Sequence, residues 1–264
     1  MSMTTSSVEA FSLYSDLYAR FRPAYPESLY DWLLPLCPGY QRAWDCATGS
    51  GQTAVRLGNS FARVDATDIS SNQLSVAERH TQVYYRECPA EVTPFDDDCF
   101  DLICVSQALH WFHLPSFWPE VQRVLKPGGI FAAWGYHHCV VTPEIDKACS
   151  VLWSIIEPFW SSRCELLWDD FRGSGCPLPL LKAPSFSIRE DWTLDHFLGF
   201  LNTTSASKLC KQALGESILD EACLRIARAW GHGGERRRVE LPLHLMVARK
   251  DAARFFPAVI EPTP

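Results

Sequence analysis

The sequence has 264 residues, with 31 acidic and 24 basic side chains and a formal charge of −7 at pH 7. This balance repels polyanionic nucleic acid, so neither DNA nor RNA is expected as a partner. Apolar runs are all too short to cross a bilayer, and residues 1–8 lack the basic start and apolar stretch of a secretory signal. We therefore expect a soluble cytoplasmic protein without membrane contact, whose 11 cysteines are mostly buried and reduced.

Short β-rich runs alternate with helical patterns through the first half of the chain. Strands are expected at residues 42–46, 63–68, 83–87, 100–106 and 129–136. Helices are expected at residues 53–57, 72–79 and 117–125. Pro127 and the two glycines after it should end the last helix. This alternation is typical of βαβ units and predicts an α/β fold with a mostly parallel sheet.

The rhythm of the sequence changes after residue 136. Trp153, Trp160 and the apolar residues between them recur at helical spacing, and a cluster of Gly and Pro follows at residues 173–184. We interpret this segment as an inserted helical cap. A strand at 186–192, helices within 194–230 and a closing strand at 239–249 complete the expected pattern.

At residues 43–52 an apolar strand runs into a loop of small residues and then into a helix. Small residues let the backbone approach a ligand closely, and a helix start offers unpaired N–H groups. Gly49, Gly51 and Ala54 satisfy the dinucleotide spacing G-x-G-x-x-G/A, and Asp68 ends the next strand, where a carboxylate can accept from ribose hydroxyls. These features fit more than one nucleotide-containing cofactor, a nicotinamide among them, and a merely tight turn is the alternative for the loop alone.

Three further motifs, in order along the chain, separate these possibilities. Pro89-Ala90-Glu91 follows the third strand, Pro-Phe-Asp-Asp-Asp-Cys-Phe-Asp-Leu-Ile leads into the fourth at residues 94–103, and Leu-Lys-Pro-Gly-Gly precedes the fifth at residues 125–129. With the glycine loop, this set resembles the class I S-adenosylmethionine-dependent methyltransferases. Residues 18–26 (Tyr-Ala-Arg-Phe-Arg-Pro-Ala-Tyr-Pro) and 107–112 (Gln-Ala-Leu-His-Trp-Phe) are similar to the methyltransferase type 11 group related to trans-aconitate methyltransferases.

The resemblance implies a Rossmann-like α/β fold: a seven-stranded, mostly parallel sheet with helices on both faces and a helical cap insertion. It divides the chain into four parts. These are an N-terminal lid segment over the cofactor at residues 1–40, the S-adenosylmethionine-binding core at 41–136, the cap and substrate insertion at 137–184, and a C-terminal completion of the sheet at 185–264.

The family pattern also implies where S-adenosylmethionine binds. Residues 47–51 would wrap its methionine and ribose, Asp68 would bind the ribose hydroxyls, and residues 106–108 would line the sulfonium. Ile69 and Ala90 would sandwich the adenine. Ala47 and Pro89 depart from the commonest pattern, which has a glycine and an acid at these positions. The expected cofactor-binding residues are Tyr18, Arg22, Asp45, Ala47, Thr48, Gly49, Ser50, Gly51, Asp68, Ile69, Gln73, Pro89, Ala90, Glu91, Ser106, Gln107 and Ala108.

His110 follows the fourth strand, where the resemblance places it near the transferring methyl group, and it is the expected catalytic residue. A neutral imidazole can orient or deprotonate an acceptor. The alternative is that His110 caps a turn or packs beneath the cap. The expected substrate-binding residues are Tyr25, Trp111, Tyr136 and His137.

Two further groups of side chains, Arg22 and a pair of histidines, bear on the site. Arg22 would pair with a carboxylate of the cofactor or of the substrate, or else form a surface ion pair. No metal site is expected, because the neighbouring His137 and His138 on an extended chain would point in opposite directions.

These expectations together favour S-adenosylmethionine-dependent methyl transfer to a small-molecule acceptor by a monomer or homodimer. The resemblance favours a carboxylate or hydroxyl oxygen as the acceptor atom. The alternatives are an NAD-dependent oxidoreductase, supported by the glycine spacing and Asp68, and a catalytically silent protein that binds S-adenosylmethionine.

Overall fold

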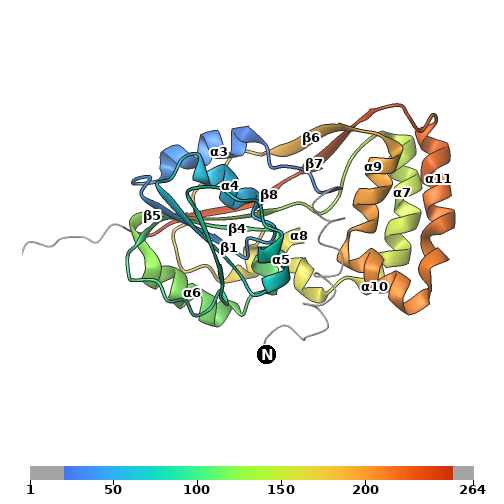
Figure 1. The fold of residues 1–264 in the computed structure, drawn as a ribbon. Coiled ribbons are helices and arrows are strands. Elements are labelled where there is room, and N and C mark those ends of the chain that lie inside the picture. The colour runs from blue at the N-terminus through green and yellow to red at the C-terminus, as the bar shows by residue number, and fades with distance from the viewer. Residues whose placement is uncertain (1–20, 252–264) are drawn as a thin grey trace, which may run out of the picture.

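The computed structural model describes residues 21–251, so Tyr18 and the rest of residues 1–20 lie outside the described residues. Within this range a six-stranded sheet forms the centre of one half of the molecule (Figure 1). Its strands are β1 (Arg42–Cys46), β2 (Arg63–Asp68), β3 (Val83–Glu87), β4 (Phe100–Ser106), β5 (Leu125–Gly135) and β8 (His244–Arg249). They are ordered β3-β2-β1-β4-β5-β8, and all neighbours are parallel except β5 and β8.

The predicted α/β fold is confirmed, but the predicted count of seven strands is wrong, because the described residues place six in this sheet. The strand expected at residues 186–192 forms β6 (Ser187–Trp192), which pairs with β7 (Arg237–Pro242) in a separate two-stranded sheet. The closing strand expected at 239–249 is therefore split. Pro242 has no N–H to continue a ladder, and after Leu243 the chain joins the large sheet as β8.

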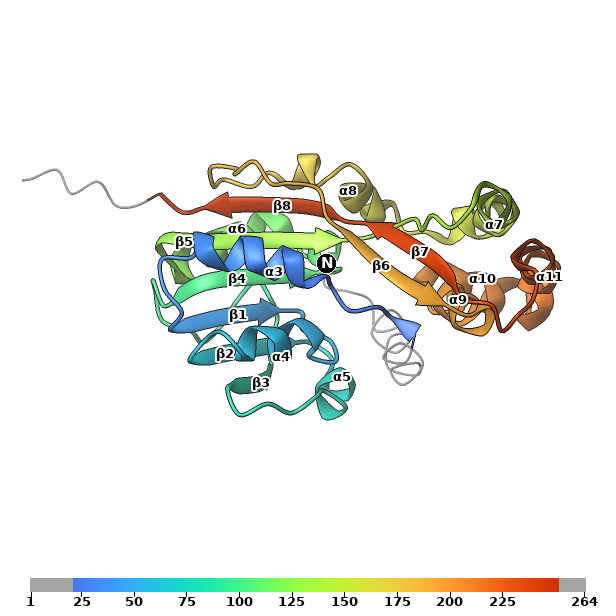
Figure 2. The same cartoon turned by 90° about the horizontal axis from the view of Figure 1, so that it is seen from above.

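Apolar side chains alternate between the two faces of the large sheet, because successive residues of a strand point in opposite directions. On one face, Ala43 and Leu102 pack with Leu29 of α3 (Glu27–Leu33) and with α4 (Gln52–Gly58). On the other, Trp44 packs against Phe117 of α6 (Leu114–Val124). Figures 1 and 2 show these helices on opposite sides of the strands.

Several boundaries differ from the expected ones, and those of one helix and of β5 differ most at one end. The helix expected at residues 72–79 is α5, which covers only Ser71–Ser75. Pro127 and the two glycines after it, expected only to end the preceding helix, are part of β5, whose pairing with β4 shifts register between Phe100 and Leu102. Gly128, with φ 79°, allows the strand to make this irregular start.

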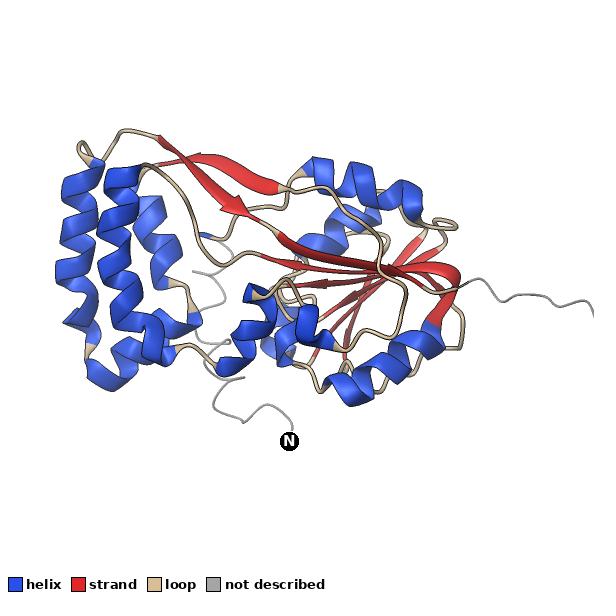
Figure 3. Cartoon of the chain, turned by 180° about the vertical axis from the view of Figure 1, so that it is seen from behind, coloured by secondary structure: helices blue, strands red, loops and turns tan. Residues whose placement is uncertain are grey.

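A helical layer forms the other half of the molecule (Figure 3). It contains α7 (Pro143–Ile156), α9 (Leu194–Asn202), α10 (Ser205–Leu214) and α11 (Asp220–Trp230), and β6 and β7 run from it to the sheet. The residues expected as a cap thus supply α7, while the other three helices come from later in the chain. The short helix α8 (Glu165–Trp168) lies nearer the sheet. No helix among residues 21–251 is both long and apolar enough to span a membrane.

Candidate active site

The loop between β1 and α4 is held in a shape that small residues permit. Ala47, Gly49 and Gly51 all have positive φ, at 56°, 57° and 87°. A Cβ on Gly51 would lie 2.1 Å from the Tyr85 hydroxyl oxygen, whereas one on Gly49 would have no described atom within 4 Å. The loop is therefore packed against β3 at Gly51 and open at Gly49.

Asp68 ends β2 beside this loop. Its Oδ2 accepts from the Gly49 main-chain N–H at 2.9 Å, and its Oδ1 accepts from that of Ser70 at 2.8 Å. Burial raises the pKa of the carboxyl, and the main-chain hydrogen bonds oppose that rise. The two bonds fix the carboxylate against the open part of the loop, with lone pairs left over, because each oxygen can accept more than one bond.

Asp45, one residue before the end of β1, is fully buried. Its Oδ2 accepts from the Thr48 hydroxyl at 2.5 Å, and burial raises its pKa to about 7. Its Oδ1 is buried without a hydrogen-bond partner within residues 21–251. The loop is therefore built over a carboxylate that has an acceptor position to spare.

The residues expected at the adenine differ in exposure. Ile69 is exposed at the end of β2, Pro89 is exposed after β3, and Ala90 is buried. Glu91 accepts through Oε1 from the main-chain N–H of His113, at 2.9 Å, and so joins this region to the start of α6. Gln73 is buried in α5, and its main-chain N–H donates to the Ser70 side chain that caps this helix.

The turn after β4 lies between the glycine loop and a pocket. Ser106 accepts from the Thr53 hydroxyl at 3.2 Å, and Thr53 belongs to α4. Gln107 has φ 57°, and its side-chain amide donates to the Tyr136 carbonyl at 3.1 Å. A Cβ on Gly135 would lie 2.5 Å from the Gln107 Oε1, so a glycine is needed for this side chain to cross the end of β5.

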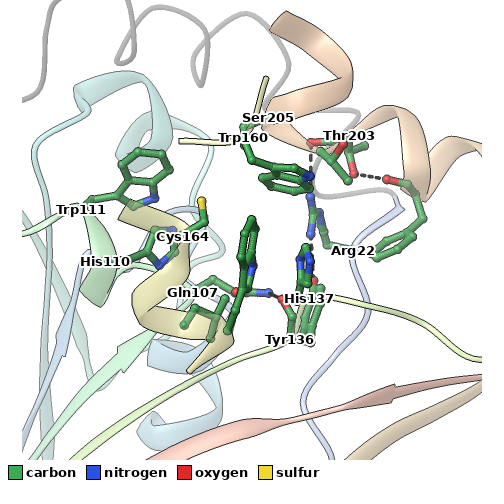
Figure 4. Close-up of a pocket in the computed structure, with 14 residues that line it drawn as sticks. Arg22, Gln107, His110, Trp111, Tyr136, His137, Trp160, Cys164, Thr203 and Ser205 are labelled. Atoms are coloured by element: carbon green, nitrogen blue, oxygen red, sulfur yellow. Dashed lines mark hydrogen bonds between the residues drawn. The ribbon is translucent and has the colours of Figure 1, made fainter. Parts of the chain in front are cut away.

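The pocket beside this turn has aromatic walls (Figure 4). They come from the turn after β4, the end of β5, the segment around α8, and α9. The aromatic lining residues are Trp111, Tyr136, His137, Trp160, Trp168 and Phe200. The ring of His137 packs at a tilt of 30° against that of Trp168, with centroids 4.4 Å apart, and burial, with the nearby His138 and His244, lowers the pKa of His137 to about 3.

His110 lies in the pocket wall on a short 3-10 turn, Leu109–Trp111. Burial, and to a smaller extent the charge of Arg163, lowers its pKa to about 4, so the imidazole is neutral at pH 7. Its Nδ1 is buried without a hydrogen-bond partner in the described part of the chain. A neutral imidazole in this position can accept a proton.

Arg22 lies across the pocket from His110 (Figure 4). Its guanidinium donates to the Tyr136 hydroxyl and to the Thr203 carbonyl, both at 3.2 Å. The guanidinium carbon is 5.1 Å from the ring centroid of Phe200. Arg22 thus connects the end of β5 with the junction of α9 and α10.

The expected site residues fall into two groups that meet at the turn after β4. One surrounds the glycine loop and Asp68, and the other lines the pocket. Tyr25 is buried, with its ring 5.6 Å from that of Trp134, and does not line the pocket. Within residues 21–251, no group of three or more His, Cys, Asp or Glu residues is arranged to hold a metal ion.

Sequence motifs did not indicate every lining residue. Phe200, Thr203, Thr204 and Ser205 complete the pocket, although they follow the glycine loop by about 150 residues. They belong to no motif with a chemical signature. Only the fold of the helical layer brings them to the ends of β4 and β5.

Comparisons with known proteins agree with this geometry. Residues 44–133 match the family model described as a methyltransferase domain. The solved structure of a "Putative Type II Methyltransferase" from Anaeromyxobacter dehalogenans is 36% identical, covers 88% of this chain and 99% of that chain, and superposes with a TM-score of 0.82. A "Putative methyltransferase" of Dictyostelium discoideum is 25% identical over 251 residues, 92% of this chain and 95% of that protein.

A third relative is an uncharacterized methyltransferase of Mycobacterium tuberculosis. It is 38% identical over 113 residues, which are 42% of this chain and 46% of that protein. The chain thus spans less than half of this relative.

The sheet, the loop at its edge and these relatives define an enzyme class. The chain belongs to the class I S-adenosylmethionine-dependent methyltransferases. This membership decides between the cofactors that the glycine spacing left open, in favour of S-adenosylmethionine over a nicotinamide. The finer similarity to trans-aconitate methyltransferases stays a prediction.

Proposed function

We propose that this enzyme transfers a methyl group from S-adenosylmethionine to an oxygen atom of a small-molecule acceptor. The observation that carries the proposal is the junction of two sites at one edge of the sheet. The glycine loop with Asp68 lies on one side of the turn after β4, and the aromatic pocket with His110 lies on the other. A donor and an acceptor bound on the two sides would meet at Ser106–His110.

The residues of the loop fit the cofactor. Asp68 is held by two main-chain N–H groups and keeps lone pairs for the two ribose hydroxyls. Gly49 leaves open space where a side chain would otherwise stand, so the backbone of residues 47–51 can approach the methionine portion. Asp45 lies beneath the loop with a spare acceptor position, and a cationic cofactor bound above it would favour the ionised form of this carboxyl.

The adenine would lie over the ends of β2 and β3. Ile69, exposed at the end of β2, offers an apolar surface to one face of the base, and Ala90 would meet the other. Gln73 lies beside this position in α5. Glu91 keeps acceptor capacity beyond its bond to His113, which makes it the candidate for the edge of the base.

S-adenosylmethionine supplies a methyl group that its sulfonium has already activated, so the chain chiefly has to position the acceptor and exclude water. The aromatic walls of the pocket serve both purposes. His110 is neutral and would take the proton of an acceptor hydroxyl. A carboxylate acceptor would need no base, so loss of His110 separates the two oxygen acceptors.

The test is incubation of the full chain with methyl-labelled S-adenosylmethionine and a metabolite extract, followed by identification of labelled products. We expect labelled small molecules whose new methyl group is on oxygen. If the protein binds S-adenosylhomocysteine but labels nothing, the catalytically silent alternative is correct. Labelled carbon, nitrogen or sulfur would overturn the choice of acceptor atom.

A further inference from the structure

The charge distribution in the pocket limits what the acceptor can be. Arg22 is the one side chain with a fixed charge among the described residues that line it, and no carboxylate lines it there. His110 and His137 are neutral, because burial lowers the pKa of each. The described lining therefore carries one positive charge, with Arg163 near His110 and Lys208 near Arg22 as further cations outside the lining, and this arrangement favours negative charge on the ligand and disfavours a cation.

The walls set the shape of the acceptor. The aromatic rings that line the pocket present flat, mostly apolar faces, and such faces favour a ring that can stack on them. An open-chain molecule with several carboxylates would place most of its charges against indole rings, because the described lining offers one guanidinium for all of its carboxylates. Burial of unpaired charge is costly, so this pocket suits a ring with one anionic group.

The two polar ends of the pocket give the acceptor a direction. Figure 4 shows His110 and Trp111 at one side, and Arg22 with Thr203 at the other. Arg22 is fixed in place by its bonds to the Tyr136 hydroxyl and the Thr203 carbonyl. Two residues beyond Thr203, α10 begins, and the N-terminal end of a helix also favours negative charge.

We propose that the acceptor is an aromatic hydroxy acid whose carboxylate pairs with Arg22, whose ring lies between the aromatic walls, and whose hydroxyl faces His110. Arg22 then determines acceptor specificity and does not hold the cofactor. The hydroxyl oxygen forms a bond to the methyl carbon while the carbon–sulfur bond breaks. The bonding pair stays on sulfur, and the hydroxyl proton passes to the His110 imidazole. This inference rests on the proposed function.

The first test compares four acceptors with the wild-type chain and methyl-labelled S-adenosylmethionine. They are 4-hydroxycinnamate, its uncharged methyl ester, the phenol tyramine, whose alkylammonium group is cationic, and the open-chain tricarboxylate trans-aconitate. We expect kcat/KM to fall about tenfold or more from the acid to its ester, because a charge-assisted hydrogen bond is lost. We expect kcat/KM to be lowest for tyramine and trans-aconitate. Preference for tyramine or trans-aconitate, or no transfer to 4-hydroxycinnamate or other one- and two-ring hydroxy acids, overturns the inference.

The second test uses Arg22→Met, with Arg228→Met as the matched control, since Arg228 is exposed on α11. We expect Arg22→Met to raise KM for the acid about tenfold or more and to leave KM for the ester and the affinity for S-adenosylhomocysteine unchanged. Arg22→Lys should recover part of the loss. Weaker S-adenosylhomocysteine binding by Arg22→Met would instead assign this residue to the cofactor.

The two proposals fail in different ways. If S-adenosylhomocysteine does not bind the wild-type chain, or no acceptor of any class is methylated, the proposed function itself is wrong. If methyl transfer occurs but prefers neutral, cationic or open-chain acceptors, only the assignment of the aromatic hydroxy acid is wrong.

Discussion

At the scale of single residues, two carboxylates near one loop, the buried Asp45 and the half-buried Asp68, have different surroundings. Asp68 is held by two main-chain N–H groups, while Asp45 is bonded by one hydroxyl and has a buried oxygen without a partner in the described chain. Burial raises the pKa of both carboxyls, that of Asp45 to about 7, and hydrogen bonds oppose the rise in each. Asp68 is thus the carboxylate that the main chain positions at the open part of the loop, where the ribose would bind.

We predict that Asp68→Ala weakens binding of S-adenosylhomocysteine at least about tenfold, because a charged acceptor is worth about 1.5–3 kcal/mol per hydrogen bond. Calorimetric titration measures this directly. Asp31→Ala, an exposed carboxylate on α3, is the control and should bind normally. Unchanged affinity in Asp68→Ala, with the fold intact by circular dichroism, would refute the assignment.

His110 predicts a pH dependence of stability. Burial lowers its pKa from 6.5 to about 4 in the folded state, so between these values the unfolded chain binds the proton more readily. The free energy of unfolding should therefore fall as pH drops from about 6.5 towards 4. Urea unfolding at several pH values should show a weaker fall in this window for His110→Gln. An identical slope in the variant and wild type would show that this histidine is not buried neutral.

At the scale of elements, the loop between β1 and α4 contains two glycines whose surroundings differ, one closely packed and one open. Gly51 packs against the Tyr85 hydroxyl, and Gly49 faces open space. Both have positive φ, which disfavours any other residue by about 1–2 kcal/mol. Packing therefore depends on Gly51, and ligand approach on Gly49.

Alanine at these two positions should accordingly have different effects. Gly51→Ala should lower the free energy of unfolding by about 1–3 kcal/mol more than Gly49→Ala, because its Cβ also collides with Tyr85. Denaturant unfolding checks this difference. Tyr85→Phe removes the colliding oxygen and should partly restore Gly51→Ala, and equal costs at the two glycines would contradict the packing described here.

How far the sequence predicts these elements depends on how local their causes are. β1 to β4 lie at the expected residues, because each is a short buried run bounded by turn residues. β6 and β7 form their own sheet through pairs such as Ser187 with Pro242. The hydrophobic periodicity of a segment does not indicate which strand it pairs with when the two strands are far apart in the sequence. Arg22 and His110 were expected at the site, whereas Thr203 was not, since only tertiary packing brings it there.

At the scale of the whole molecule, the sheet and the helical layer each contribute part of the site. The loop, Asp68 and His110 belong to the half that contains the sheet, while Phe200 and Thr203 belong to the helical layer. The core in contact with β1 and β4 continues without a break into α7, α9 and α11. A ligand that fits the site should therefore stabilise one cooperative unit.

We predict that S-adenosylhomocysteine at about 100 times its Kd raises Tm by roughly 5–10 °C, since mass action adds about 2.7 kcal/mol to stability. NAD(H) at the same concentration is the matched comparison and should leave Tm unchanged. A thermal-shift assay decides between them. Stabilisation by NAD(H) alone would contradict the assigned cofactor.

Leu243, the single residue between β7 and β8, has a mechanical consequence. Beside it, the chain leaving β5 pairs with β7 through the bridge of Val140 and Glu240. Two adjoining segments of backbone therefore connect the helical layer to the sheet at this point. The segment that passes through Leu243 has a link of only one residue. Adding one residue at Leu243 would shift the register of β8 and turn its side chains to the opposite faces of the sheet. Evolution can therefore change acceptor specificity by exchanging side chains in the pocket much more easily than by lengthening this link.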